Sequence, residues 1–331
     1  MAFVLFMGGK HGSGADLYAR RLAATLGAAV VPVACGETFA SARAAWDALA
    51  PDARPLIADT VLSAFAPMAA FLAERRAAIL LHEPPAPAEG CSDAERTAAA
   101  EREKQVLAAA PSILASSEAT AEAMAVGRVV PRERITVVEP PTPELSRARG
   151  TGLRETMIFA PGCGIPDRAH AVLFRALAGL SDLEWRLCIA GLAAADGAKA
   201  AALAALAARF DLASRVRCEV RPDGADDEAL WLESDLFASA AASPGYGMAT
   251  AAAMKRGLPA VIAGDAGSVP RIPAEAGAIA APDDHVQLAK ALRRLIFDRD
   301  LRAAMAEAAW QAGRLLPTER DVRERLLAAM G

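Results

Sequence analysis

The sequence has few aromatic residues and no excess of positive charge. Only 5% of its residues are aromatic, with four Trp and two Tyr among them, and 36 Lys and Arg stand against 40 Asp and Glu. Single-stranded nucleic acids need aromatic side chains for stacking, and nucleic-acid-binding domains in general present a basic surface. Nucleic acid is therefore not an expected partner.

Cysteine and histidine are sparse and scattered. The five cysteines are odd in number and contain no C-x-x-C pair, and no two of the four histidines are spaced i, i+4. This pattern excludes a disulfide framework and a zinc site, and no other metal ligands are evident, so no metal is expected. His170 and His285 are predicted to lie on the surface.

Long hydrophobic runs are also missing, although 54% of the residues are hydrophobic. Much of that fraction is alanine, and no segment approaches the roughly 20 apolar residues that span a bilayer. The opening run 2–7 is too short for a signal peptide and lacks a basic start. We expect a cytoplasmic protein. The amphipathic, Arg-rich tail 320–330 allows peripheral membrane contact, but packing against the first domain is the favoured alternative.

The 331 residues favour two domains of roughly 150 residues each. Short apolar runs alternate with alanine-rich segments of helical period, one of which ends near Arg76. The pattern predicts an α/β protein with two Rossmann-like, doubly wound parallel-sheet domains that face each other across a cleft. The proline-rich segment 139–152 is the predicted linker. We expect domains at 1–145 and 146–304, with helices 305–331 packing back on the first domain.

Residues 226–307 resemble the donor domain of retaining GT-B glycosyltransferases of the GT4 type (glycosyltransferase group 1). They contain an acidic helix start, a strand, the turn PGYG, a helix with an A-M pair, the motif GLP before a strand, and a G-x-x-P turn, in the order of that family. The first half resembles the acceptor-side domain more loosely, in the glycine pair after its first strand, a strand that ends in His82, and SILASSEATAEAM. The resemblance implies a nucleotide-sugar donor such as a UDP- or GDP-sugar, and no cofactor.

The sequence departs from this family at its acidic positions. The family has two glutamates separated by seven residues around a G-[FY]-G turn, and here Pro244 and Ala252 occupy the glutamate positions. A third acidic position holds Arg271. Of the basic pair at the start of the donor domain, the arginine position is Cys163 and the lysine position is Arg168. We therefore expect a degenerate form of the motif.

Several residues are nevertheless expected to contact a nucleotide sugar. Glycines allow close backbone approach, free N–H groups at a helix start bind phosphate, and a guanidinium binds a diphosphate. As the resemblance implies, His82 would contact donor or acceptor; Glu83, beside it in the sequence, would orient the acceptor or act as a base. The predicted catalytic residues are His82, Glu83 and Arg168, and the predicted donor-binding residues are Gly8, Gly9, Cys163, Pro244, Gly245, Tyr246, Gly247, Thr250 and Ser268.

Simpler interpretations remain open for each of these residues. GGKHGSG is neither a P-loop nor an in-register dinucleotide fingerprint, and it is also compatible with a plain turn. His82 is alternatively a hydrogen-bonded strand-end histidine, and Arg168 a solvated helix residue. At the level of function, the alternatives to a glycosyltransferase are a catalytically silent binding or partner subunit and a sugar-nucleotide epimerase. The sequence leaves the acceptor (a glycan, a lipid or a small molecule) and any homo- or hetero-oligomer open.

Overall fold

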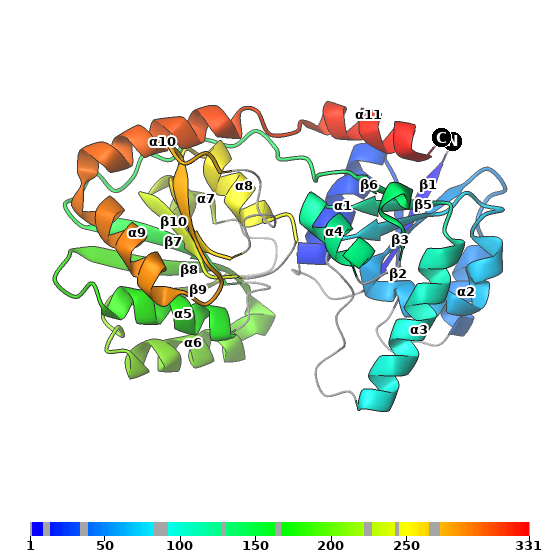
Figure 1. Cartoon of the computed structure of the whole chain (residues 1–331), viewed down its shortest axis with the longest axis horizontal. Coiled ribbons are helices and arrows are strands. Elements are labelled where there is room, and N and C mark those ends of the chain that lie inside the picture. The colour runs from blue at the N-terminus through cyan, green and yellow to red at the C-terminus, as the bar shows by residue number, and fades with distance from the viewer. Residues whose placement is uncertain are drawn as a thin grey trace. The chain divides into compact units, whose positions relative to one another are not determined.

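The computed structural model describes residues 2–8, 14–33, 39–82, 92–126, 130–162, 167–221, 227–241, 245–264 and 272–330. The chain forms two compact units (Figure 1). Unit 1 comprises Met1–Pro141, Pro244–Tyr246 and Pro317–Gly331, and unit 2 comprises Thr142–Ser243 and Gly247–Leu316. The chain thus passes from unit 1 to unit 2 within the predicted linker, and the short segment Pro244–Tyr246 and the C-terminal segment from Pro317 belong to unit 1 again.

Unit 1 contains a six-stranded parallel sheet with the order β2-β1-β3-β4-β5-β6. Its strands are β1 (Phe3–Gly8), β2 (Ala29–Val33), β3 (Arg54–Ala58), β4 (Ala78–Leu81), β5 (Ser112–Ala115) and β6 (Ile135–Val137). Its helices are α1 (Gly14–Leu26), α2 (Phe39–Asp47), η1 (Asp59–Phe71), α3 (Asp93–Ala109), α4 (Glu118–Val126), η2 (Arg132–Arg134) and α11 (Glu319–Met330).

Both faces of this sheet are covered. Neighbouring residues such as Leu56 and Ile57 are both fully buried, although their side chains point to opposite faces. Helices α2 and α3 pack with η1, and α11 packs against α1 and β5. Arg54 fixes the end of α11, because its guanidinium donates to the carbonyl of Met330 at 2.6 Å. Two-sided burial explains why these strands are continuous apolar runs.

Unit 2 contains a second parallel sheet of six strands, with the order β12-β11-β10-β7-β8-β9. Its strands are β7 (Thr156–Pro161), β8 (Trp185–Ala193), β9 (Val216–Arg221), β10 (Leu236–Ser239), β11 (Ala260–Ala263) and β12 (Gly277–Ala280). Its helices are α5 (Asp167–Ala178), η3 (Ala194–Asp196), α6 (Gly197–Arg209), α7 (Glu228–Leu232), α8 (Met248–Lys255), α9 (His285–Phe297) and α10 (Arg299–Gly313).

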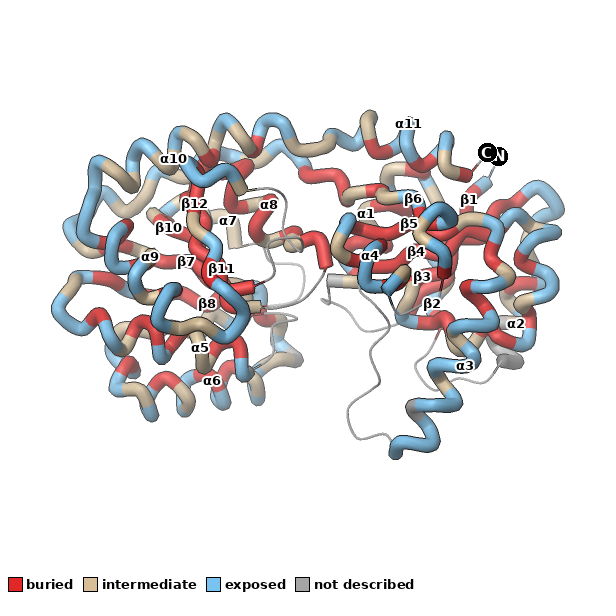
Figure 2. The backbone as a smooth tube through the Cα atoms, viewed as in Figure 1, coloured by how far each residue is buried: buried red, intermediate tan, exposed pale blue. Residues whose placement is uncertain are grey.

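The core of each unit lies on its own sheet, and the inner strands are largely buried (Figure 2), whereas the edge strands β2 and β9 are mostly exposed or half-buried. In unit 2, α5 and α9 pack against each other, and α8 packs against α10. The predicted fold class, two doubly wound α/β domains with parallel sheets, is confirmed. One local prediction is wrong: the segment expected to be a helix ending near Arg76 is a 3₁₀ helix that ends at Phe71. Pro67 lies inside it and cannot donate to an α-helical ladder.

The segment between the units is extended and hydrogen-bonded at both ends. In unit 1, a guanidinium nitrogen of Arg21 donates to the carbonyl of Pro141 at 3.2 Å. In unit 2, the N–H of Ala148 donates to the carbonyl of Arg256 at 2.8 Å. The buried Lys255 forms an ion pair with Glu144 at 2.7 Å. Most of this segment therefore belongs to one unit or the other.

Candidate functional site

Residues that follow strand carboxyl ends in unit 1 form one set of polar groups, here called the first rim: Gly8, Asp59, Thr60, His82, Ser116 and Thr120. Because β1, β3, β4 and β5 are parallel neighbours, their ends share one edge of the sheet. The N–H of Gly8 donates to the hydroxyl of Thr60 at 3.2 Å. This amide, predicted to approach a ligand, is therefore already hydrogen-bonded within unit 1.

His82 is the predicted catalytic residue on the first rim, and only 5% of it is exposed. Its backbone N–H donates to the Asp59 carboxylate at 2.7 Å. Its ring lies 5.9 Å from that of Tyr18, centroid to centroid. Burial, and to a lesser extent the charge of Asp59, raises the pKa of Tyr18, so its phenol stays neutral at physiological pH. The hydroxyl of Tyr18 donates to the carbonyl of Val138 at 3.1 Å.

The corresponding strand ends of unit 2 form the second rim, defined here as Gly162, Arg168, His170, Ser239, Gly247 and Gly264. Its turns are closely packed. A Cβ on Gly162 would lie 2.8 Å from Cγ of Leu192, so this position accepts only glycine without rearrangement. The N–H of Gly162 donates to the carbonyl of Ala190 at 2.7 Å, which extends the strand pairing beyond β7.

His170 supports the turn after β7. The prediction that it lies on the surface is wrong, because only 2% of it is exposed. Its Nε2 lies 3.1 Å from the carbonyl oxygen of Pro161, at hydrogen-bond distance. The sequence carried a signal for this that was not used: His170 is three residues before Leu173 and four before Phe174, on the buried face of α5.

The helix α8 begins at a glycine in the left-handed conformation. Gly247 is the N-cap, with φ of 73°, and no side chain caps the helix there. The first N–H groups of α8 are therefore available to an acceptor other than a capping side chain. Tyr246, just before it, is buried, and so is Thr250 within the first turn. Ala252, which is predicted from the sequence to occupy the family's second glutamate position, is half-buried.

The structure places some of the predicted site residues and leaves others outside the described part. Gly8 and His82 lie on the first rim, Gly245 to Gly247 precede α8, and Arg168 is exposed in the first turn of α5. Five predicted residues lie outside the described residues: Gly9, Glu83, Cys163, Pro244 and Ser268. The site assignments stay predictions.

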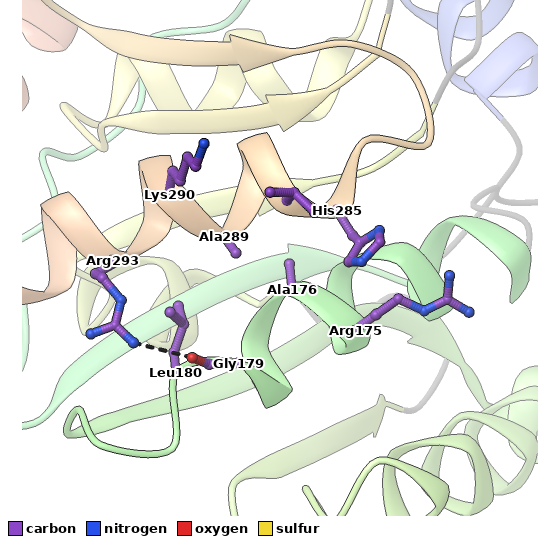
Figure 3. Close-up of a pocket in the computed structure, with 9 residues that line it drawn as sticks. Arg175, Ala176, Gly179, Leu180, His285, Ala289, Lys290 and Arg293 are labelled. Atoms are coloured by element: carbon purple, nitrogen blue, oxygen red, sulfur yellow. Dashed lines mark hydrogen bonds between the residues drawn. The ribbon is translucent and has the colours of Figure 1, made fainter.

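A surface groove of about 350 Å³ lies between α5 and α9 in unit 2 (Figure 3). Ala176, Leu180 and Ala289 contribute apolar surface, and cations stand along its sides. One of them, Arg293, is held by an ion pair with Asp182 and donates to the carbonyl of Gly179. None of the predicted site residues with described positions lines this groove, so it is separate from the two rims.

No group of three or more His, Cys, Asp or Glu side chains in the described residues is arranged to hold a metal ion. Across the same residues, no helix has the length and apolar character needed to cross a membrane.

Comparison with known proteins assigns the chain to a family. The sequence profile described as "Glycosyl transferases group 1" matches residues 143–312, more than half of the chain and most of unit 2. The chain belongs to this family. The matched region includes α8, the turn before it, and the start of α5. No curated protein matches the chain significantly in sequence.

Solved glycosyltransferase structures share the fold of this group 1 chain over its whole length. HepE (Alr3699) of Anabaena, in complex with UDP and glucose, is 17% identical and has a TM-score of 0.78, with 99% of this chain and 98% of HepE covered. Sucrose-phosphate synthase of Thermosynechococcus elongatus is 15% identical, with a TM-score of 0.76 and the same coverage. At these identities the likeness concerns the fold, which is GT-B.

Sequence reasoning missed the groups that surround His82. Asp59, Ser116 and Thr120 contact its backbone, yet none of them stood out in the sequence. Asp59 carried a usable signal, because it directly follows an apolar strand, as His82 does. Ser116 and Thr120 lie in the segment SILASSEATAEAM, whose serines and threonine resemble an ordinary helix start.

Proposed function

We propose that this group 1 glycosyltransferase transfers a sugar from a nucleotide-sugar donor to an acceptor, with retention of configuration and without a metal, as in the GT4 type. The observation that carries the proposal is the uncapped start of α8 at Gly247, on the same sheet edge as the start of α5. Backbone N–H groups at a helix start bind phosphate well, because the helix dipole adds to their hydrogen bonds.

Arg168 supplies the cation in this proposal. It is exposed in the first turn of α5, where a guanidinium has access to a diphosphate next to the strand ends. One precedent for the nucleotide is the HepE structure, which contains UDP and glucose. We therefore choose UDP-glucose as the first donor to test, followed by GDP- and ADP-sugars.

The test compares two arginines of the same helix by calorimetric titration with UDP. Arg168 and Arg175 are both exposed and lie two turns apart on one face of α5, but Arg175 lines the groove in Figure 3. A lost charge-assisted hydrogen bond costs about 1.5–3 kcal/mol, so we expect Arg168→Ala to raise the Kd for UDP roughly 10- to 100-fold. Arg175→Ala should leave it unchanged. Equal affinity in both variants and the parent would remove Arg168 from the site.

A second function, binding without turnover, is favoured by the side chain at position 252. Ala252 cannot accept a hydrogen bond from a ribose hydroxyl, as the family's glutamate does. A protein of this kind would bind the nucleotide sugar but neither hydrolyse nor transfer it. Turnover of UDP-glucose with and without EDTA, with the anomer of the early product determined by NMR, separates this function from metal-independent, retaining transfer. Product formed from the donor alone by isomerisation would indicate an epimerase.

A further inference from the structure

The backbone N–H and carbonyl of His82 are hydrogen-bonded by three side chains from three different segments of the chain. Its N–H donates to Oδ2 of Asp59, at the start of η1, at 2.7 Å. Its carbonyl accepts from the hydroxyl of Ser116, which follows β5, at 2.7 Å. The same carbonyl accepts from the hydroxyl of Thr120, in α4, at 3.1 Å.

These bonds begin where the strand pairing stops. The last backbone bond between β4 and the chain after β5 runs from the N–H of Ser116 to the carbonyl of Leu81, at 2.8 Å. One residue later, the backbone of His82 leaves the sheet. Backbone N–H and carbonyl groups at exposed strand ends commonly hydrogen-bond to water. Here Ser116 and Thr120 are fully buried, and His82 is nearly so. Side chains therefore supply the hydrogen bonds that the sheet no longer provides.

The hydroxyl network continues into α4. The hydroxyls of Ser117 and Thr120 lie 3.0 Å apart, and the N–H of Thr120 donates to the hydroxyl of Ser117 at 3.1 Å. The first turn of α4 and the end of β4 are thus tied together through the carbonyl of His82. On another side, the ring of Tyr18, tilted by 47°, lies near the imidazole. The backbone of His82 has little freedom to rotate.

We propose that Asp59, Ser116 and Thr120 are positioning residues that fix the direction in which the imidazole of His82 leaves β4. For catalysis this rests on the proposed function, together with the prediction from the sequence that His82 contacts the donor or the acceptor. A side chain that leaves the backbone in the wrong direction misplaces its ring by an ångström or more, and an error of about 1 Å can cost on the order of 100-fold in rate. The three residues themselves need not touch a substrate.

The strand β5 provides a matched control for the hydroxyl pair. Ser112, at its start, donates to the carbonyl of Ala329 at 3.0 Å, as Ser116 at its other end donates to that of His82. Ser116→Ala with Thr120→Val removes both hydroxyls while keeping the side chains close in volume. We expect kcat with UDP-glucose to fall roughly 10- to 100-fold, with KM within about 3-fold. Ser112→Ala should leave both constants unchanged. A double variant with the kcat of the Ser112→Ala protein would overturn the proposal.

Asp59 is tested by rescue. Asp59→Ala removes the acceptor for the His82 N–H, whereas Asp59→Asn keeps an oxygen of similar reach. The alanine variant should lose kcat as the double variant does, and the asparagine variant should recover most of it. Equal losses in both would mean that the negative charge of Asp59, and not its hydrogen bond to His82, matters for activity, which contradicts a positioning role.

An NMR measurement keeps the inference testable apart from activity. The chain has four histidines, so ¹⁵N-labelled histidine gives few ring signals, and His82→Ala assigns that of His82. In the double variant the His82 signal should shift and broaden, because the ring adopts more than one orientation, while the His285 signal stays in place. An unchanged His82 signal would overturn the proposal. UDP binding, measured as above, decides the proposed function separately.

Discussion

The two rims offer different chemistry, although they lie on sheets of the same topology class. The first rim consists mainly of polar side chains that hydrogen-bond to backbone groups, chiefly to the N–H and the carbonyl of His82. The second rim consists largely of glycine turns and backbone amides. A Cβ on Gly264 would lie 2.8 Å from the carbonyl oxygen of Ala241, and Gly162 is similarly enclosed. Side chains are excluded from much of this edge.

This difference bears on the prediction that Pro244 and Ala252 occupy the family's glutamate positions. A site that holds a diphosphate by main-chain N–H groups depends on backbone conformation more than on side-chain identity. In the proposed function, an alanine at position 252 removes hydrogen bonds to the ribose and leaves the phosphate site intact. The first rim is less tolerant, because its hydrogen bonds to Gly8 and to the backbone of His82 are made by side chains.

The largest effect is expected from the two buried histidines, one on each rim. His82→Ala should lower kcat on the order of 100-fold, as loss of a group that contacts the reacting sugar typically does. His170→Ala removes the partner of the Pro161 carbonyl in the turn after β7, so we expect a higher donor KM and a lower Tm, with a smaller change in kcat. Steady-state kinetics and thermal unfolding measure these quantities. A kcat loss in His170→Ala as large as that in His82→Ala would contradict the assignment of different roles to the two rims.

A gain of affinity is expected if a carboxylate is introduced on α8. Ala252→Glu places one at the position predicted from the sequence to correspond to the family's second glutamate, where the alanine is half-buried. One hydrogen bond to a ribose hydroxyl is worth about 1 kcal/mol, so the Kd for UDP should fall roughly 5-fold. Ala205→Glu is the control, because it introduces the same negative charge at an exposed position within α6 and not in α8. Tighter binding in the control, or none in Ala252→Glu, would place position 252 away from the nucleotide.

The sequence was sufficient for the fold because its signals are local. Continuous apolar strands such as AAILLH, each followed by a helix, permit little except a parallel sheet covered on both faces. The same pattern predicts a strand over 77–82; β4 ends one residue earlier, at Leu81, and His82 directly follows its carboxyl end. Family resemblance, and not periodicity, supplied Arg168 and the Gly245–Gly247 turn.

The sequence could not reveal the partners of His82 because they are distant along the chain. Asp59 is 23 residues away, and Thr120 is 38 residues away. Which hydroxyl meets which carbonyl depends on the register of β3, β4 and β5, and pattern alone does not determine register between strands. The burial of His170 was missed for a related reason: a polar residue on the apolar face of a helix is ambiguous until its partner, the Pro161 carbonyl, is known.

The smallest expected effect is on stability: as the pH falls, one glutamate in each unit changes the free energy of unfolding, and the two changes have opposite signs. In unit 2, the pKa of Glu228 is lowered mainly by its hydrogen bonds to the buried guanidinium of Arg256. In unit 1, burial raises the pKa of Glu139, and Arg325, 3.9 Å away, opposes this only in part. Ionised Glu228 therefore stabilises its unit above the ordinary glutamate pKa of about 4.3, and this contribution is lost as the pH falls. Ionised Glu139 costs stability over the same range, and protonation relieves that cost.

Two glutamine variants test whether ionised Glu228 and ionised Glu139 have opposite effects on stability. At about pH 7, Glu228→Gln should lower the free energy of unfolding by about 1 kcal/mol, since Glu228 is one-third exposed, and Glu139→Gln should raise it by less than that. As the pH falls, each variant should approach the parent once the glutamate it replaces is protonated, Glu139→Gln first and Glu228→Gln at lower pH, because the pKa of Glu139 is raised and that of Glu228 is lowered. Urea unfolding at a series of pH values measures the differences. Changes of the same sign at pH 7 would show that Arg325 compensates the burial of Glu139 as fully as Arg256 does for Glu228.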